Sequence, residues 1–310
     1  MQKALAFIKK NPLLVLGLAV VAVIGLLNID RLPKETVLFA LGLIIFFSCA
    51  KLSWQEFKNI RLVPLISFTL LRFAAFPVAA LYLLQFIVPE EYWLGVFLLL
   101  LCPAGFSLMA FSASFGGNTS LALLLTIVTS LLAPFTIPFL SDAVLDQKVQ
   151  VDTITMCVQL LMVIVIPAAL YIVSVRFYPQ LKTWIKMNNN FYVLMLLGTI
   201  GTIALAQQFN VFANNLDFIG GAFVICALLY PVLYLVGWFF AFHDERRTKI
   251  TKALASGAMN VSLAIGIALL YFPPKVTAFL IVSDLVWFAA IPVFRRVLPY
   301  LRLPNWRKYQ

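Results

Sequence analysis

The stretch Leu100-Leu101-Cys102-Pro103-Ala104-Gly105-Phe106-Ser107 (LLCPAGFS) interrupts an apolar run that would otherwise form one membrane-spanning helix. Pro103 has no backbone N–H and disfavours helical geometry just before itself, and Gly105 gives a helix little support. We expect the helix to break here, about 16 Å into the bilayer when counted from Tyr92 at about 1.5 Å per residue. Backbone groups freed at that depth must be buried in protein or line a watery cavity. A simple proline kink, satisfied by neighbouring helices, is the alternative.

The composition of the chain makes the lipid bilayer its solvent. Of the 310 residues, 63% are hydrophobic and only 11% are charged, and the mean hydropathy is +1.00. These values exclude a cytosolic enzyme and a disordered chain. A spanning helix needs about 20 apolar residues, so the chain has room for roughly ten helices and little else. The expected class is an all-α integral membrane protein with a single transmembrane domain over residues 1–310.

Long apolar runs predict ten spanning helices, which we number 1 to 10. They are Leu13–Ile29, Val37–Leu52, Leu62–Phe86, Tyr92–Phe115, Ser120–Phe139, Asp152–Val175, Phe191–Gln207, Phe218–Phe242, Thr251–Phe272 and Val276–Phe294. With this count, most of the 23 lysines and arginines fall on one side of the membrane, and the acidic loops Glu90–Glu91 and Asp142–Asp146 fall on the other. Cytoplasmic loops are enriched in Lys and Arg. We therefore expect both termini to be cytoplasmic, in a bacterial inner membrane, and explain the net charge by topology rather than nucleic acid binding.

Ten helices divide into two five-helix repeats, and repeats with an odd number of helices must be inverted in the membrane. Repeat 1 covers residues 12–145 and repeat 2 covers residues 150–296, both with approximate ends. The fourth helix of each repeat is interrupted, because helix 9 carries Ala255-Ser256-Gly257-Ala258-Met259-Asn260-Val261-Ser262 at a depth similar to that of LLCPAGFS in helix 4. Discontinuous helices near the midplane form the binding sites of secondary transporters. We predict that helices 4 and 9 are broken and cross each other.

Two ionisable residues lie deep within the runs, Arg72 in helix 3 and Asp284 in helix 10. Each is ten residues from the cytoplasmic end of its run, and therefore about 15 Å into the membrane. Such residues are costly in hydrocarbon and mark ion or substrate pathways. The matching depths favour an ion pair, or a pair that exchanges partners with a substrate carboxylate or a proton. A static bridge between two helices is the alternative.

The uncharged candidates for substrate or ion binding lie around the two breaks. They are Pro103, Gly105, Ser107, Thr126, Thr129, Gly257, Asn260 and Ser262, with Ser130 beside them. A Ser or Thr in a spanning helix most often bonds its own backbone or a neighbouring helix, whereas Asn260 brings a full amide near mid-depth. The four cysteines lack the spacing of metal ligands, so no cofactor is expected apart from Na⁺ or H⁺ as a coupling ion.

At these residues the sequence resembles the bile acid:sodium symporter family. The features that look like its signature for helices 4 and 5 are Cys102-Pro103-Ala104-Gly105, Gly116-Gly117-Asn118, Thr126, Ala133-Pro134 and Pro138. Those that look like its helix 9 signature are Arg246-Arg247-Thr248, Gly257, Asn260 and Leu263-Ala264. The resemblance implies a panel of helices 1, 2, 6 and 7, a core of helices 3, 4, 5, 8, 9 and 10, and a substrate between panel and core.

The sequence departs from the pattern of the sodium-coupled members that it resembles. Those members carry Ser-Asn after the helix 4 break, a hydroxyl pair in helix 5, and Glu and Gln in helix 9. The residues at these positions here are Leu108, Met109, Ala122, Thr126, Ala255 and Met259. Hard cations want oxygen ligands, so sodium coupling of the family type is expected to be weak or absent. Asp284 becomes the leading candidate for a proton or cation carrier.

The favoured interpretation is a secondary active transporter of a small organic anion, which works by alternating access and is coupled to protons or to a residual sodium site. The first alternative is a cation/proton exchanger of the Na⁺/H⁺ type on the same fold, with Asp284 as the carrier. The second is a non-transporting sensor or an enzyme. An enzyme needs converging acid, base or metal groups, and only Arg72 and Asp284 lie at depth, so no enzymatic activity is expected. The expected partners are the lipid bilayer and a small organic anion or a monovalent cation.

Overall fold

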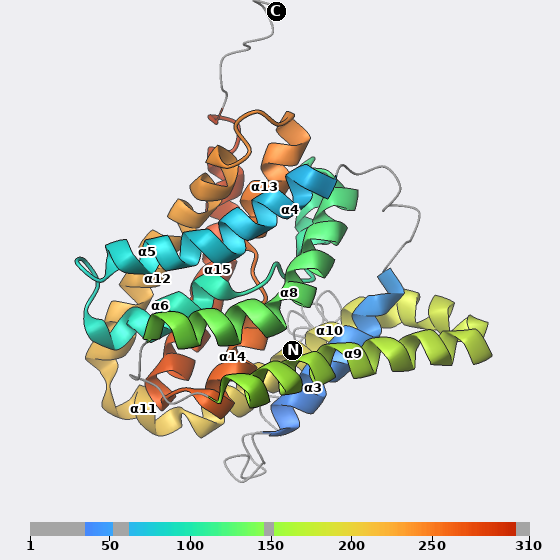
Figure 1. Cartoon of the computed structure of the whole chain (residues 1–310), viewed down its shortest axis with the longest axis horizontal. Helices are drawn as coiled ribbons and strands as arrows, with labels where there is room; N and C mark the ends of the chain where they lie inside the picture. The colour runs from blue at the N-terminus through green and yellow to red at the C-terminus, as the bar shows by residue number, and fades with distance from the viewer. Residues whose placement is uncertain (1–34, 52–61, 146–151, 302–310) are drawn as a thin grey trace, which may run out of the picture.

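The chain folds into helices that pack around an extended apolar core (Figure 1). The structure is a computed structural model that describes residues 35–51, 62–145 and 152–301. Predicted helix 1, Leu13–Ile29, lies outside the described residues. Within the described ranges the chain forms no β-strand, only one isolated bridge between Ala104 and Met259. The all-α class is therefore confirmed.

The described helices follow the predicted runs in order. They are α3 (Glu35–Ser48) with the 3-10 turn η2 (Cys49–Lys51), α4 (Leu62–Leu70), the π-helical turn η4 (Leu71–Ala75), α5 (Phe76–Leu84), α6 (Glu90–Leu101), α7 (Leu108–Ser114), α8 (Thr119–Leu145), α9 (Thr153–Phe177), α10 (Pro179–Gln207), α11 (Phe209–Asn214), α12 (Leu216–Phe239), α13 (Arg246–Gly257), α14 (Val261–Tyr271) and α15 (Pro274–Val297). Predicted helices 3, 4 and 9 are each built from more than one element. Predicted helices 2, 5, 6, 7, 8 and 10 correspond to α3, α8, α9, α10, α12 and α15.

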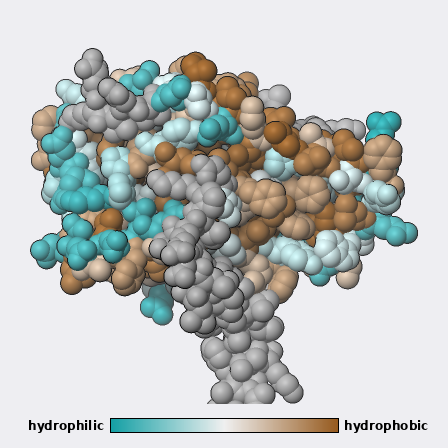
Figure 2. All heavy atoms as spheres, turned by 90° about the horizontal axis from the view of Figure 1, so that it is seen from below, coloured by the Kyte–Doolittle hydropathy of each residue, from teal (hydrophilic) through white to brown (hydrophobic). Residues whose placement is uncertain are grey.

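Several of these helices have the length and apolar character of membrane spans. Five qualify within the described residues, namely Val63–Leu84, Thr119–Ala143, Thr153–Phe177, Leu216–Phe239 and Pro274–Val297. The two parts of α10, which are bent by 62° relative to each other, make a sixth if they are counted as one span. Broad hydrophobic areas on the surface in Figure 2 agree with contact to lipid. The chain is an integral membrane protein, and the inverted ten-helix arrangement stays a prediction.

Helix ends differ from the apolar runs that predicted them, most of all at the start of α10 and at the end of α8. α10 begins at Pro179 rather than Phe191, because the preceding polar stretch is helical as well and a proline is well tolerated in the first turn. α8 continues past Phe139 to Leu145. Hydropathy identifies only the part of a helix that faces lipid or core. It therefore does not predict a polar extension of the same helix.

The helices fall into two neighbouring groups. α3 packs most extensively against α9 and α10, and α12 packs against α13 and α15. Figure 1 shows α3, α9 and α10 together at one side of the molecule, with α4, α5, α6, α12, α13 and α15 on the other. The contact between the two groups contains the breaks in predicted helices 4 and 9.

Candidate functional site

Both predicted breaks are present, and they are bonded to each other. The first lies between α6 and α7, and the second lies between α13 and α14. Gly105 N donates to Ala258 O at 2.8 Å, and Asn260 N donates to Pro103 O at 2.8 Å. The two segments thus run antiparallel for one bridge at Ala104 and Met259. This pairing satisfies backbone groups that could not otherwise remain unpaired inside a membrane.

The two glycines of the predicted site act through close packing rather than by presenting a side chain. A Cβ on Gly105 would lie 3.1 Å from Met259 O and 3.2 Å from Ala258 O, which is tighter than ordinary contact. A Cβ on Gly257 would overlap the ring of Tyr234. Gly105 therefore permits the pairing of the breaks, and Gly257 permits α13 to pack on α12.

The two threonines of the predicted site hold the first break against α8. Thr129 Oγ1 accepts a hydrogen bond from Ala104 N at 3.0 Å and donates to Leu125 O at 2.6 Å. Thr126 Oγ1 lies within donating distance of Gly105 O, at 3.3 Å, and of Ala122 O. Both threonines are buried. Their hydroxyls support the broken backbone in this structure.

Arg72 reaches into the ends of both broken helices. Its Nη1 donates to Leu100 O at 3.1 Å, and its Nη2 donates to Ser256 O at 2.7 Å. Leu100 and Ser256 lie in the last turns of α6 and α13, where helical carbonyls have no intrahelical partner. Nη2 also contacts Met259 Sδ at 3.3 Å. The Arg72 side chain is 0% exposed.

The expected ion pair between Arg72 and Asp284 is not formed. Among the described residues the salt bridges are Lys252–Asp244, at 2.6 Å, and Lys275–Glu91, at 2.8 Å. Arg72 turns instead toward the backbone carbonyls at the breaks, while Asp284 lies half-buried on α15. Equal depth was the basis of the expectation, and depth does not fix the direction in which a side chain points. The role of Asp284 as a proton or cation carrier stays a prediction.

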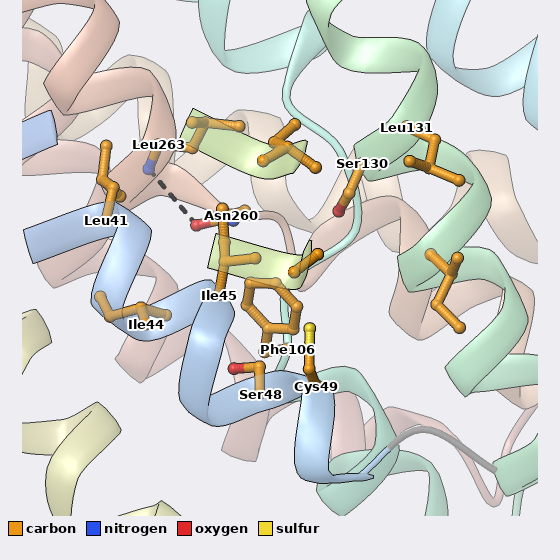
Figure 3. Close-up of a pocket in the computed structure, with 13 residues that line it drawn as sticks. Leu41, Ile44, Ile45, Ser48, Cys49, Phe106, Ser130, Leu131, Asn260 and Leu263 are labelled. Atoms are coloured by element: carbon orange, nitrogen blue, oxygen red, sulfur yellow. Dashed lines mark hydrogen bonds between the residues drawn. The ribbon is translucent and has the colours of Figure 1, made fainter. Parts of the chain in front are cut away.

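A cavity of about 110 Å³ lies beside the paired breaks (Figure 3). Its walls come from α3 and η2, from α8, from α9, from α14 and from the two breaks. The lining residues are Leu41, Ile44, Ile45, Ser48, Cys49, Phe106, Ile127, Ser130, Leu131, Ile164, Ala168, Asn260 and Leu263. None of them carries a charge. Of the candidates named from the sequence, Asn260 and Ser130 line the cavity, whereas Ser107 and Ser262 are half-buried outside it.

Three polar side chains interrupt the apolar wall of this cavity, and Figure 3 shows them around the ring of Phe106. Asn260 Oδ1 accepts from Leu263 N at 3.3 Å and caps α14. The hydroxyls of Ser48 and Ser130 are buried and have no hydrogen-bond partner among the described residues. A buried hydroxyl without a partner costs about 1–3 kcal/mol, so a ligand that bonds to it recovers that cost. Ser48 was missed from the sequence, because a single Ser in an apolar run carries no signal.

Four of the six residues that stand at the sodium-site positions of the family pattern are close-packed and apolar. Leu108, Ala122 and Ala255 are each 0% exposed, and Met259 is 4% exposed. The sulfur of Met259 contacts Arg72 rather than open space. These side chains supply no oxygen ligand for a hard cation.

Comparison with known protein families identifies a family that this chain matches. A model of the Sodium Bile acid symporter family matches residues 38–215, which is more than half of the chain. The matched region begins in α3 and ends after α11, so it contains the first break, α8 and α9. No curated protein matches this chain.

Proposed function

Because this chain belongs to the sodium bile acid symporter family, whose members are transporters rather than enzymes, we propose that it is a secondary active transporter of a small organic anion. The observation that carries the proposal is the cavity beside the paired breaks. Its lining combines residues of α3 and α9 with residues of α8, α14 and the first break. A ligand there would touch predicted helices 2 and 6 on one side and predicted helices 4, 5 and 9 on the other.

Alternating access follows from this position of the cavity. In the proposed arrangement, predicted helices 1, 2, 6 and 7 form a panel, and helices 3, 4, 5, 8, 9 and 10 form a core. The chain would comprise two inverted repeats, approximately residues 12–145 and 150–296, with both termini cytoplasmic in a bacterial inner membrane. Movement of the core against the panel would open the cavity to one side of the membrane and then to the other.

The lining of the cavity favours an anion with an apolar body. Apolar walls accommodate hydrocarbon, and the Ser48 and Ser130 hydroxyls are free to donate hydrogen bonds to an anionic oxygen of the ligand. Pockets that hold drug-sized ligands have volumes of about 300–1,000 Å³, so this cavity suits a small anion or one end of a larger one. Accumulation would be coupled to protons or to a residual sodium site.

The cation/proton exchanger is less well supported. It requires a carboxylate in the transport path, and Asp284 does not line the cavity. The groups that do line it are apolar side chains, hydroxyls, a thiol and an amide. This lining suits an organic solute better than a bare cation, which wants several oxygen ligands.

The test is transport by protein reconstituted in liposomes, after a thermal-shift screen of carboxylates has identified an anion that stabilises the protein. Ala168→Trp fills the cavity from α9 and is expected to abolish uptake of that anion. Ala169→Trp is the matched control, because Ala169 is the next residue of the same helix and is exposed. Undiminished uptake by correctly folded Ala168→Trp would refute the cavity as the transport site. Sodium/proton exchange without any anion transport would favour the exchanger instead.

A further inference from the structure

The C-terminal ends of two half-helices converge on one point inside the protein. α6 ends at Leu101 and α13 ends at Gly257, and the breaks that follow them are bonded to each other. The C-terminus of a helix carries a partial negative charge and carbonyl groups without intrahelical partners. Two such ends inside a membrane protein create a site that favours a cation.

The cation at this point is the guanidinium of Arg72. One of its terminal nitrogens binds Leu100 O of α6, and the other binds Ser256 O of α13, at 3.1 and 2.7 Å. No described carboxylate forms a salt bridge with Arg72. Its positive charge is therefore balanced by the helix ends and by the rings of Phe73 and Phe76, whose centroids lie 4.9 and 5.3 Å from the Arg72 Cζ.

A local irregularity in the third predicted helix accompanies this placement of Arg72. The helix widens through the π-helical turn η4, in which Phe76 N donates to Leu71 O, five residues back. Arg72 is fully buried in this turn, while the adjacent Leu71 is 44% exposed. Single π turns within α-helices are rare overall, but those that occur often lie at functional sites.

The surroundings of the guanidinium exclude a second cation. Met259 contributes its sulfur at 3.3 Å from Nη2, and sulfur is a poor ligand for a hard cation such as Na⁺. Ala255 and Leu108 are 0% exposed and offer no side-chain oxygen. The carbonyl oxygens of Leu100 and Ser256 each already accept a hydrogen bond from the guanidinium.

We propose that Arg72 is a tethered cation, which holds the ends of α6 and α13 in the place that a coupling Na⁺ would otherwise fill, so that transport proceeds without sodium. The proposal deepens the proposed transport function and rests on it. A covalently held cation cannot be released in the cycle, so the crossover stays loaded in every state. A sodium gradient then contributes no driving force, and accumulation depends on another ion.

The first experiment compares the melting temperature (Tm) of purified wild-type protein in NaCl and in choline chloride at equal ionic strength. We expect the same Tm in both salts, because no site for Na⁺ is open between the helix ends. A saturable rise of Tm with NaCl overturns the proposal. This measurement needs no substrate. A failure of the tethered cation is thereby separated from a failure of the proposed transport function, which is decided by anion uptake alone.

The second experiment removes the guanidinium. Arg72→Ala leaves both helix ends without a cation and is expected to lower Tm by about 5 °C or more. Millimolar guanidinium chloride is expected to restore most of that loss. Lys252→Met is the matched control, because Lys252 is also a buried cation but is paired with Asp244, so guanidinium should not repair its loss. A wild-type Tm in Arg72→Ala, or equal effects of guanidinium on the two variants, overturns the proposal.

The third experiment keeps the charge, which covers the case in which Arg72→Ala does not fold. Arg72→Lys is expected to retain more of the wild-type Tm than Arg72→Met and to remain insensitive to sodium. Both side chains fill the space with a flexible stem, so only the charge separates them. Equal losses in Arg72→Lys and Arg72→Met show that packing rather than charge holds the helix ends, and so contradict the proposal.

Discussion

Ser130 and Ser141 offer a comparison that separates ligand binding from folding. Both belong to α8, and both have a buried hydroxyl with no partner among the described residues. Ser130 lines the cavity, and Ser141 does not. Removal of either hydroxyl loses no hydrogen bond within the described structure. We therefore expect Ser130→Ala and Ser141→Ala to leave the Tm of the ligand-free protein unchanged or slightly raised.

The two variants should differ when the transported anion is added. A hydrogen bond to a charged group contributes about 1.5–3 kcal/mol, which corresponds to a loss of about 10- to 150-fold in affinity when it is removed. Ser130→Ala should lose that affinity, and Ser141→Ala should retain it. The assay is the dependence of Tm on anion concentration, together with the KM of uptake in proteoliposomes.

Two results would refute this reasoning. If Ser130→Ala binds the anion as tightly as the wild type, the anion does not bond to this hydroxyl. If both variants weaken binding equally, the effect spreads through α8 and the cavity is not its origin. The corresponding Ser48→Ala variant tests the opposite wall, because Ser48 belongs to α3.

Three further predictions concern pH, topology and coupling. Hydrogen bonds from the Thr155 hydroxyl and N–H hold the pKa of Asp152 below its ordinary value of 3.8. The stability that ionised Asp152 gives the folded protein is therefore complete above the unfolded pKa and is lost as the pH falls through the folded pKa. Asp152→Asn should weaken the decrease of Tm at acid pH. Glu91→Cys should react with an impermeant thiol reagent from outside the cell and His243→Cys only after permeabilisation, on a background in which all four native cysteines are buried; the reverse pattern would overturn the topology. Asp284→Asn should abolish pH-driven accumulation but spare exchange of the anion, and accumulation that persists would show that Asp284 is not the proton carrier.

The sequence was sufficient to place most of the described helices and both interruptions. Apolar runs gave the positions of α3, α8, α9, α12 and α15, because a lipid-facing helix must be apolar along its length. The interruptions could be predicted because proline and glycine change the backbone conformation at their own positions. The family resemblance rested on the same segments, and the match over residues 38–215 established it.

Other features of the site could not be predicted from the sequence. The cavity draws Ser48 from α3, Ala168 from α9 and Asn260 from the second break, and their separation along the chain gives no sign that they meet. Nor does an apolar run show where a polar helix continues, as α10 does before Phe191. Both depend on packing between helices.

Arg72 shows most clearly what the sequence determines and what only the tertiary structure decides. Its type and its depth follow from the sequence, and they predict a functional role because a charge inside a membrane needs a partner. The choice of partner depended on how the π-helical turn η4 directs the side chain and on where the two breaks leave their carbonyls. A position along one helix determines depth but not direction. Only the packed structure decided that Arg72 binds the ends of α6 and α13 rather than Asp284.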